Sequence, residues 1–457
     1  MWSVWDRGRR NALHKDLYMK SRRIDNSVKQ LRILSYNLTR PSELLIVPEA
    51  SLRLSTTSLR QCRHELSAMP SLLTIAGFRA TDIHAHIHSL TNNLVSIKDE
   101  SGKFLLNLPD GRVIDTKGWN DWEWTHGIGL YGLYQYFSLT SDTATLDIMT
   151  SWFKNRFAEG TTKNINTMSP FLTLAYLYED PSTRRREWLP WLDSWAEWAM
   201  NELPRTRYGG FQHMTYLEYN ENELWDDTLM MTVMPLAKIG LILNRPSYVE
   251  EAKRQFLLHI QYLQDNQTGL WFHGWKFEQS EEGGVGHNFA RARWARGNSW
   301  VTIAIPEFIE LLELPKGDGL RMYLENVLVQ QVEALKRLQG DNGLWRTLLD
   351  VPEDRGSYVE SSATAGFAYG ILKAVRKGYI SRDYKEVGLR AVTAVAGKIS
   401  KEGELMDTSF GTGMGHDLEH YLKIERTSMP YGQAMGIMCL VEFLRDFIGY
   451  SEDFSNR

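Results

Sequence analysis

Apolar residues recur every three or four positions along most of the chain from about residue 80 onward, and loops rich in Gly, Asn and Asp separate these segments. Such a repeat places the apolar side chains on one face of a helix. No stretch shows the strict alternation of a half-buried strand. The pattern predicts twelve helices, over residues 80–98, 125–140, 142–159, 167–180, 184–203, 224–243, 246–265, 296–313, 316–339, 359–378, 381–400 and 430–447.

The loops between these helices repeat one short element, a Gly turn followed by an aromatic or apolar residue. Gly210, Gly269, Gly343 and Gly403 are separated by 59, 74 and 60 residues, and each interval holds two predicted helices. Six copies of such a hairpin predict an all-α fold, a closed (α/α)6 toroid with a concave mouth where the inner helices begin; an open helical solenoid is the alternative. We therefore expect an irregular N-terminal extension of unassigned role, residues 1–79, and a catalytic barrel, residues 80–457.

Composition and charge exclude several classes of function. The chain has 457 residues, 43% of them apolar, which is enough for a large core without metals or disulfides. Its net charge of −4 argues against a nucleic-acid partner, although residues 1–32 carry nine Lys/Arg against three Asp. We expect a cytoplasmic protein without a membrane span, because no run of 18 apolar residues and no signal sequence is present. Cys62 and Cys439 form no metal-ligand or disulfide pattern.

Two adjacent carboxylates stand near the start of the predicted helix 224–243. Asp226 and Asp227 directly follow Trp225 and precede an apolar run. Neighbouring side chains on a helix point about 100° apart, so burying one leaves the other pointing sideways. One interpretation is a helix cap, because Asp oxygens accept hydrogen bonds from the free N–H groups of a first turn. The other is a catalytic pair, and the position alone leaves both open.

Aromatic residues and histidines gather at the predicted loop-to-helix junctions. The chain has 16 Trp and 20 Tyr, and flat rings at the mouth of a pocket suit the faces of sugars, although the same rings can also fill a wide core. Histidines at these junctions favour ligand binding over a purely structural role when several share one rim. The residues concerned are Trp119, Trp122, Trp124, His126, His213, Trp271, His273, Trp275, Trp294 and Trp300.

Arg296 and a glycine-rich segment complete the candidate chemistry. Arg at a helix start opposes the helix dipole, whereas its guanidinium suits a carboxylate from a substrate or from an aspartate across the pocket. No Ser/His/Asp or Cys/His nucleophile motif and no phosphate-binding loop after a strand is present. Residues 411–415 are Gly-rich but are expected to precede no helix for ten or more residues, which favours a flexible lid.

Taken together, the chain from about 115 to 447 resembles the unsaturated uronyl hydrolases of glycoside hydrolase family 105, and more distantly those of family 88. Five segments in order carry the resemblance: 122–127 (Trp-Glu-Trp-Thr-His-Gly), 225–231 (Trp-Asp-Asp-Thr-Leu-Met-Met), 272–275 (Phe-His-Gly-Trp), 294–300 (Trp-Ala-Arg-Gly-Asn-Ser-Trp) and 360–369 (Glu-Ser-Ser-Ala-Thr-Ala-Gly-Phe-Ala-Tyr). The resemblance implies the six-hairpin toroid independently of the repeats.

The same resemblance implies a reaction and the residues that carry it. The substrate would have a C4=C5 unsaturated uronic acid at its non-reducing end, with unsaturated galacturonyl-rhamnose as the expected disaccharide. The family pattern Trp-x-Asp selects Asp227 as the single catalytic residue, which would protonate C4 and then accept a proton from water attacking C5. A water-poor aromatic pocket would raise the pKa of Asp227 by desolvation, so that it carries this proton near neutral pH. The residues implied to bind substrate or line the pocket are Trp124, His213, Trp225, His273, Trp294, Arg296 and Trp300.

One position departs from the family pattern. Relatives place a second aspartate on the helix that follows the third one, whereas this chain has Asn166, which can orient a sugar or water but cannot share a proton. We expect no metal and no organic cofactor, a small oligosaccharide as the partner, and a monomer or weak homo-oligomer. A sugar epimerase on the same toroid and a catalytically silent sugar-binding relative remain as alternatives.

Overall fold

The helices alternate along the chain between fully buried and half-buried ones. Every residue of α10 except Glu310 is buried, whereas α9 buries a stripe of residues spaced three or four apart. A helix that is apolar all round needs neighbours on every side, and an amphipathic one covers it from outside. The inner helices of the described residues are α4 (Trp124–Thr140), α6 (Pro170–Glu179), α8 (Met234–Ile242), α10 (Ala295–Leu311), α12 (Ser361–Arg376) and α15 (Pro430–Ser455), and the outer ones are α3 (Ala80–Ser96), α5 (Thr143–Glu159), α7 (Leu189–Asn201), α9 (Pro246–Leu263), α11 (Gly319–Leu338) and α13 (Lys385–Ala396).

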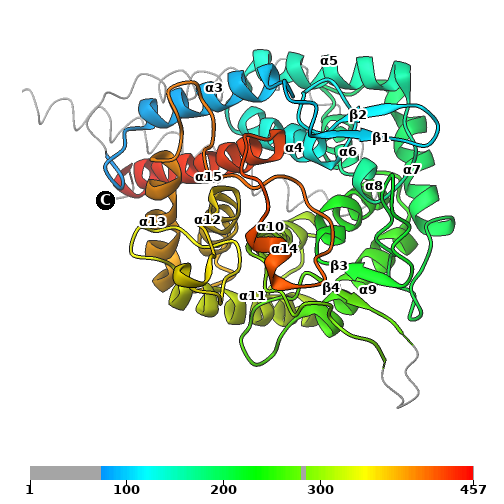
Figure 1. The fold of residues 1–457 in the computed structure, drawn as a ribbon. Coiled ribbons are helices and arrows are strands. Elements are labelled where there is room, and N and C mark those ends of the chain that lie inside the picture. Colours follow the sequence, from blue (N-terminus) through cyan, green and yellow to red (C-terminus); the bar gives the residue numbers. More distant parts are fainter. Residues whose placement is uncertain (1–73, 279–284, 456–457) are drawn as a thin grey trace, which may run out of the picture. The chain divides into compact units, whose positions relative to one another are not determined.

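The inner helices form a closed ring, which Figure 1 shows from the side of the short helix α14 (Leu418–Leu422). Contacts run from α4 through α6, α8 and α10 to α12. Helix α15 closes the ring: Gly366 of α12 lies against Met435, and a Cβ on Gly132 of α4 would lie 2.8 Å from the backbone of Ala434. Only glycine permits this last approach. The predicted (α/α)6 toroid is confirmed, and the open solenoid is excluded.

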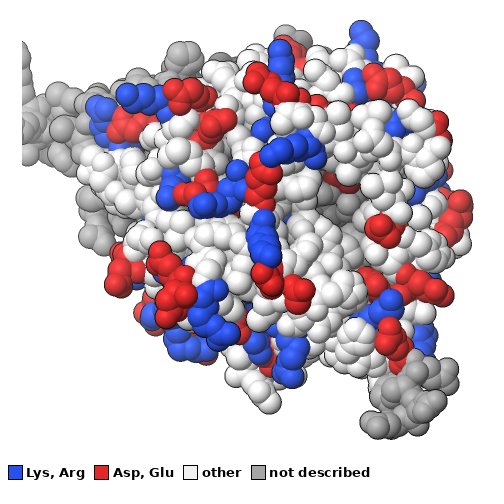
Figure 2. Space-filling view, viewed as in Figure 1, with Lys and Arg blue, Asp and Glu red and all other residues white. Residues whose placement is uncertain are grey.

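The computed structural model describes residues 74–278 and 285–455, and Ala76–Asp446 forms one compact unit. The predictions for residues 1–73 lie outside the described residues. Among the described residues, no helix combines the length and the apolar character that a membrane span requires. On the face drawn in Figure 2, Lys and Arg are interspersed with Asp and Glu.

The predicted helix 224–243 is wrong at its start. Residues Glu223–Trp225 form strand β3, which pairs antiparallel with β4 (Gly274–Lys276), and a π-helical turn, Leu229–Val233, precedes α8. A second small sheet, β1 (Leu105–Asn107) with β2 (Val113–Asp115), and helix α14 were also missed. Strands of three residues contain too little alternation to be recognised. The other predicted helices overlap the observed ones, and α15 continues to Ser455 instead of ending at 447.

The repeated turn is real, with one shift in its alignment. Gly209, Gly269, Gly343 and Gly403 have φ angles of 81, 82, 80 and 82°, so each copy reverses the chain through the same left-handed conformation. Only glycine adopts this conformation without a steric penalty. In the first copy the glycine with the positive φ angle is Gly209 and not Gly210. The alignment agrees with this, because Phe211 follows Gly209 by two positions, as Trp271 follows Gly269.

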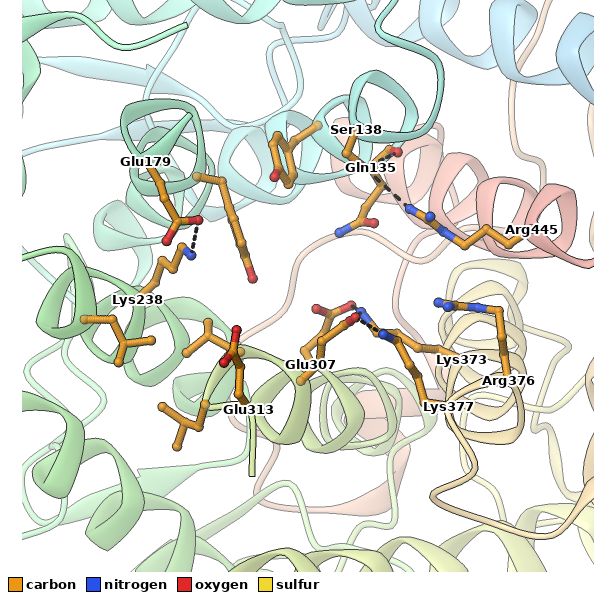
Figure 3. A pocket seen from close by; sticks show the side chains of 16 residues that line it. Gln135, Ser138, Glu179, Lys238, Glu307, Glu313, Lys373, Arg376, Lys377 and Arg445 are labelled. Atoms are coloured by element: carbon orange, nitrogen blue, oxygen red, sulfur yellow. Dashed lines mark hydrogen bonds and ion pairs between the residues drawn. The ribbon is translucent and has the colours of Figure 1, made fainter. Parts of the chain in front are cut away.

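The two ends of the ring differ in character. At the C-terminal ends of the inner helices, a cavity of about 630 Å³ is lined by charged residues and tyrosines (Figure 3). Most of its charges are paired: Lys373 lies 2.5 Å from Glu307 and 2.6 Å from Glu310, and Lys238 lies 2.6 Å from Glu179. The predicted site residues belong to the opposite end, where the inner helices begin. The cavity is therefore separate from the candidate site.

Candidate active site

The small sheet β3–β4 brings two distant segments together at the start of α8. Trp225 pairs with Gly274, and the N–H of Asp226 donates to the carbonyl of His273 at 3.0 Å. This places Asp227 next to His273, although the two are 46 positions apart. The strand that the sequence did not reveal is therefore the element that positions the predicted catalytic residue.

Asp227 is held by a chain of hydrogen bonds. His273 Nε2 lies 3.1 Å from Asp227 Oδ2, and His273 Nδ1 lies 2.8 Å from the hydroxyl of Tyr421 in α14. Burial lowers the pKa of His273, so the ring is neutral at neutral pH. Since a carboxylate only accepts, the hydrogen is on Nε2, and Nδ1 accepts from Tyr421, whose oxygen accepts from the N–H of Gly415 at 3.0 Å.

The two aspartates differ in access and in charge. The side chain of Asp227 is 14% exposed, and its pKa lies well below its ordinary value. Burial opposes this shift, but the hydrogen bond from His273 and the charge of Arg296 outweigh it. The expectation of a raised pKa for Asp227 is therefore wrong. The aromatic residues around Asp227 are accompanied by a hydrogen-bond donor, His273, and a cation, Arg296, and these lower the pKa more than burial raises it.

Asp226 has the opposite character. It is 0% exposed, and neither of its carboxylate oxygens has a hydrogen-bond partner. Burial and the neighbouring charge of Asp227 hold its pKa well above its ordinary value, which favours the protonated form of Asp226. The helix-cap interpretation of Asp226 is not supported, because a capping side chain accepts an N–H from the first turn.

Arg296 lies at the start of α10 with its guanidinium enclosed by aromatic rings. Nη1 donates to the hydroxyl and carbonyl of Ser409 at 2.8 and 3.0 Å, to the carbonyl of Phe410 at 3.0 Å and to the hydroxyl of Tyr431 at 2.6 Å. The guanidinium carbon lies 4.2 Å from the centre of the Trp294 ring. No ion pair joins Arg296 to an acidic residue among those described, so a cation is held in place without a carboxylate of its own.

The predicted aromatic residues divide into exposed and buried ones. Trp124 is partly exposed, and its ring lies 4.7 Å from that of Tyr431. Trp300 is 0% exposed, and the centre of its ring lies 6.0 Å from that of Trp124, so its predicted contact with substrate stays a prediction. Trp225 stacks on His213 at 4.1 Å, and both rings are almost fully buried beside Asp227. Trp294 is likewise buried, between His273 and Arg296.

His126 is the one rim histidine that the structure places elsewhere. Its Nε2 lies 2.6 Å from the carbonyl of Gly118, and its Nδ1 accepts from the N–H of Glu123 at 3.1 Å. The ring is 0% exposed, so it fixes the loop before α4. The interpretation of His126 as a ligand-binding residue is wrong because its own backbone engages both ring nitrogens.

Asn166 is partly exposed and held by a carboxylate that the sequence reasoning missed. Its Nδ2 donates to Glu123 Oε1 at 2.9 Å. Glu123 is buried at the start of α4, and burial raises the pKa of its carboxyl to about 8. This contact fixes the orientation of the amide and leaves Oδ1 of Asn166 as the group that can accept a further hydrogen bond.

Comparison with known proteins identifies the family. The profile described as Glycosyl Hydrolase Family 88 matches residues 96–447, well over half of the chain. The chain belongs to glycosyl hydrolase family 88. The predicted resemblance is thereby confirmed, and the protein is a glycosidase.

Individual relatives of this family 88 glycosidase agree in fold and in description. The chain is 27% identical to the unsaturated rhamnogalacturonyl hydrolase YesR of Bacillus subtilis, over 71% of this chain and 90% of that protein. A solved structure from Salmonella enterica, described as a possible member of family GH105, is 59% identical with a TM-score of 0.79, covering 83% of this chain and 97% of the other. Another so described, from Klebsiella pneumoniae, is 56% identical with a TM-score of 0.78, covering 89% and 100%.

One part of the glycosidase site, helix α14 with Tyr421, was not recognised in the sequence. Tyr421 lies on α14, whose start is marked by Asp417 accepting the N–H of His420 at 2.8 Å, a cap pattern that could have predicted this helix. The expectation that no helix follows residues 411–415 within ten positions is therefore wrong. A Cβ on Gly411 would lie 3.0 Å from the Trp124 ring, so this segment packs directly against the site. Its predicted mobility as a lid stays a prediction.

Asp226, Asp227 and His273 are also the described group that comes nearest to a metal site. Their potential ligand atoms lie within 4.8 Å of one another. We assign no metal to them, because His273 directs its Nε2 hydrogen at Asp227 and Asp226 is sealed from solvent. The prediction that the glycosidase needs no metal stays open to the test given below.

Proposed function

We propose that this glycosidase hydrates the C4=C5 double bond of an unsaturated uronic acid at the non-reducing end of a short oligosaccharide, with unsaturated galacturonyl-rhamnose as the expected disaccharide. The observation that carries the proposal is the pairing of Asp227, a partly exposed acid, with Arg296, a fixed cation that has no carboxylate partner among the described residues. A uronic acid supplies the missing carboxylate. The name of the relative YesR supports the class of substrate.

In the proposed mechanism, Asp227 acts as both acid and base on one face of the sugar. It transfers a proton to C4, and positive charge develops at C5 and the ring oxygen. Water then adds to C5 and returns a proton to Asp227, so that the carboxyl is regenerated and no proton is consumed. The product at C5 is a hemiketal that opens and releases the attached sugar. A single carboxyl suffices, in contrast to the acid and nucleophile pair of common glycosidases.

The surrounding residues would bind and orient the substrate. Arg296 would hold the uronate carboxylate, and the partly exposed ring of Trp124 would pack against a sugar face. Asn166, whose Nδ2 is engaged by Glu123, would accept a hydrogen bond from a sugar hydroxyl or from water. His273 would keep the Asp227 carboxyl oriented, and the buried Trp225, His213, Trp294 and Trp300 would fix these groups from behind.

The deciding experiment compares wild type, Asp227→Asn and Asp226→Asn on unsaturated disaccharides from pectin and from glycosaminoglycans. Hydration removes the conjugated double bond, so wild type should abolish its ultraviolet absorbance, and Asp227→Asn should not. An epimerase or a sugar-binding protein would leave the absorbance unchanged. Turnover by Asp227→Asn together with complete loss in Asp226→Asn would show that the roles of the two aspartates are assigned the wrong way round.

Cytoplasmic location and a monomeric or weakly associating state remain predictions from the sequence. Sedimentation at two protein concentrations would test the second.

A further inference from the structure

Asp226 is the least explained group near the site. It is fully buried, and neither of its oxygens has a hydrogen-bond partner. A buried polar group without a partner is costly and in native proteins usually reflects a function. The adjacent Asp227, by contrast, is hydrogen-bonded and reaches solvent.

Two groups lie next to the Asp226 carboxyl: the first turn of α10 and the side chains of Asp227 and His273. On one side it lies against Gly297 in the first turn of α10, where a Cβ would overlap both carboxylate oxygens. First-turn N–H groups have no acceptor inside their helix, so this wall is the positive end of α10. An oxygen of Asp226 also lies within 4.8 Å of the ligand atoms of Asp227 and His273, and the charge of Asp227 raises the pKa of Asp226. Asp227 is therefore the neighbour that takes a proton from the Asp226 carboxyl once side-chain rotation brings their oxygens within hydrogen-bond distance.

The charged groups facing this pair are few. Asp227 is ionised, and His273 from the β4 loop donates to it. Arg296 on α10 adds positive potential, and Tyr421 on α14 donates its hydroxyl to His273. His213 in the loop before β3 is neutral, because burial lowers its pKa to about 3. His259 on α9 lies behind His213 and is neutral, because burial lowers its pKa to about 4. The pair thus combines one acid that is easily ionised with one that is not.

Asp227 alone does not meet the requirement of the proposed reaction. The residue that protonates C4 must carry a proton when substrate arrives, whereas the contacts of Asp227 favour its ionised form. We propose that Asp226 is a positioning residue that stores the proton delivered by Asp227. This inference rests on the proposed function, and it goes beyond that function by giving the second aspartate a role.

The proton can be followed through one cycle. The O–H of the Asp226 carboxyl transfers its hydrogen to a carboxylate oxygen of Asp227, which leaves Asp226 ionised beside the positive end of α10. Asp227 passes this hydrogen to C4 as the C4=C5 pair forms the new C–H bond. Water adds its oxygen to C5, and its released hydrogen returns to Asp227 and then to Asp226. The sum is addition of one water to the double bond, with both carboxyl groups restored.

The test is the pH dependence of kcat in Asp226→Asn, which keeps the shape and neutrality of the protonated side chain. In this variant Asp227 must hold the proton without a reservoir, so the basic limb of the kcat profile should move at least one pH unit lower. At neutral pH kcat should then fall about tenfold or more relative to wild type, and the loss should diminish toward acidic pH. KM should stay unchanged, because Asp226 has no exposed surface.

Two outcomes would overturn the inference. An unchanged kcat profile would mean that Asp226 holds no catalytic proton, and an equal loss at every pH would mean that its role is only structural. If Asp226→Asn does not fold, infrared spectra of wild type and Asp227→Asn with labelled aspartate decide. Wild type must show a protonated aspartate carboxyl at neutral pH, and its absence refutes the proposal, since Asp226 is the described aspartate whose pKa burial raises. A carboxyl signal that persists in Asp227→Asn belongs to an aspartate other than Asp227.

These results separate the two proposals. Wild type that leaves the double bond of every tested disaccharide intact contradicts the proposed function, and the infrared spectra still report whether Asp226 is protonated. Active wild type with an unchanged profile in Asp226→Asn contradicts only the proton store.

Discussion

The pH dependence of stability gives a test of Asp226 that requires no substrate. In the native state Asp226 is protonated, because it is fully buried without a partner and lies beside the ionised Asp227. In the unfolded chain an aspartate ionises with a pKa of about 3.9. Between this value and the raised native pKa, the native state therefore binds one more proton than the unfolded state.

This difference fixes the sign and the size of the effect. With one proton fewer in the unfolded state, the free energy of unfolding falls by about 1.4 kcal/mol for each pH unit. Asp226→Asn cannot bind this proton in either state, so its contribution is constant with pH. We therefore expect the free energy of unfolding of Asp226→Asn, relative to wild type, to increase by about 2.7 kcal/mol between pH 5 and pH 7. Glu123, whose raised pKa of about 8 has the same sign, is present in both proteins and cancels.

Urea unfolding followed by tryptophan fluorescence at pH 5, 6 and 7 measures this quantity. Asp265→Asn is the control: the hydrogen bond from Arg293 holds the pKa of Asp265 below its ordinary value, so Asp265 is ionised in the native and the unfolded state over this range, and its difference from wild type should not change with pH. A constant difference between wild type and Asp226→Asn from pH 5 to pH 7 would show that native Asp226 is ionised, and the reasoning about its burial would be wrong.

Three further predictions concern the site. Arg296→Lys should lower kcat/KM by about 10- to 100-fold on an unsaturated uronate, mainly through KM, because an ammonium cannot bind the carboxylate with two parallel hydrogen bonds. Steady-state kinetics measure this change. An unchanged KM would contradict the binding of the uronate carboxylate by Arg296. Tyr421→Phe removes the hydroxyl that donates to His273 and should reduce kcat about 3- to 10-fold at constant KM, whereas full activity would mean that the hydroxyl is dispensable. Dialysis against EDTA should leave the rate unchanged; a loss that a divalent cation restores would place a metal at Asp226, Asp227 and His273.

The fold was largely predictable because its helices and turns leave local patterns in the sequence. Helix periodicity and the recurring Gly turn depend on local sequence, and each copy with φ near 80° requires glycine for the same steric reason. The start of the predicted helix 224–243 failed because residues 223–225 gain their strand conformation from pairing with residues 274–276, about fifty positions away. A pairing partner at that distance leaves no local pattern.

For the site, residue types and motif order selected Asp227, His273 and Arg296 as candidates, and the structure brings all three to one end of the ring. The sequence could not separate Trp124, which is partly exposed, from Trp300, which is buried behind it. Both stand near the start of an inner helix, and exposure depends on what the other helices place in front of each ring.

The sequence by itself determined the helical toroid, the family and the acidic pair that follows Trp225. Only the tertiary structure decided which aspartate carries a proton, because two neighbouring carboxyls of the same type have the same intrinsic pKa. Their difference comes from distant segments: His273 and Arg296 stabilise the charge of Asp227, and Gly297 of α10 packs against Asp226, which is fully buried. Electrostatic free energy depends on distance and burial, and these quantities exist only in the folded chain.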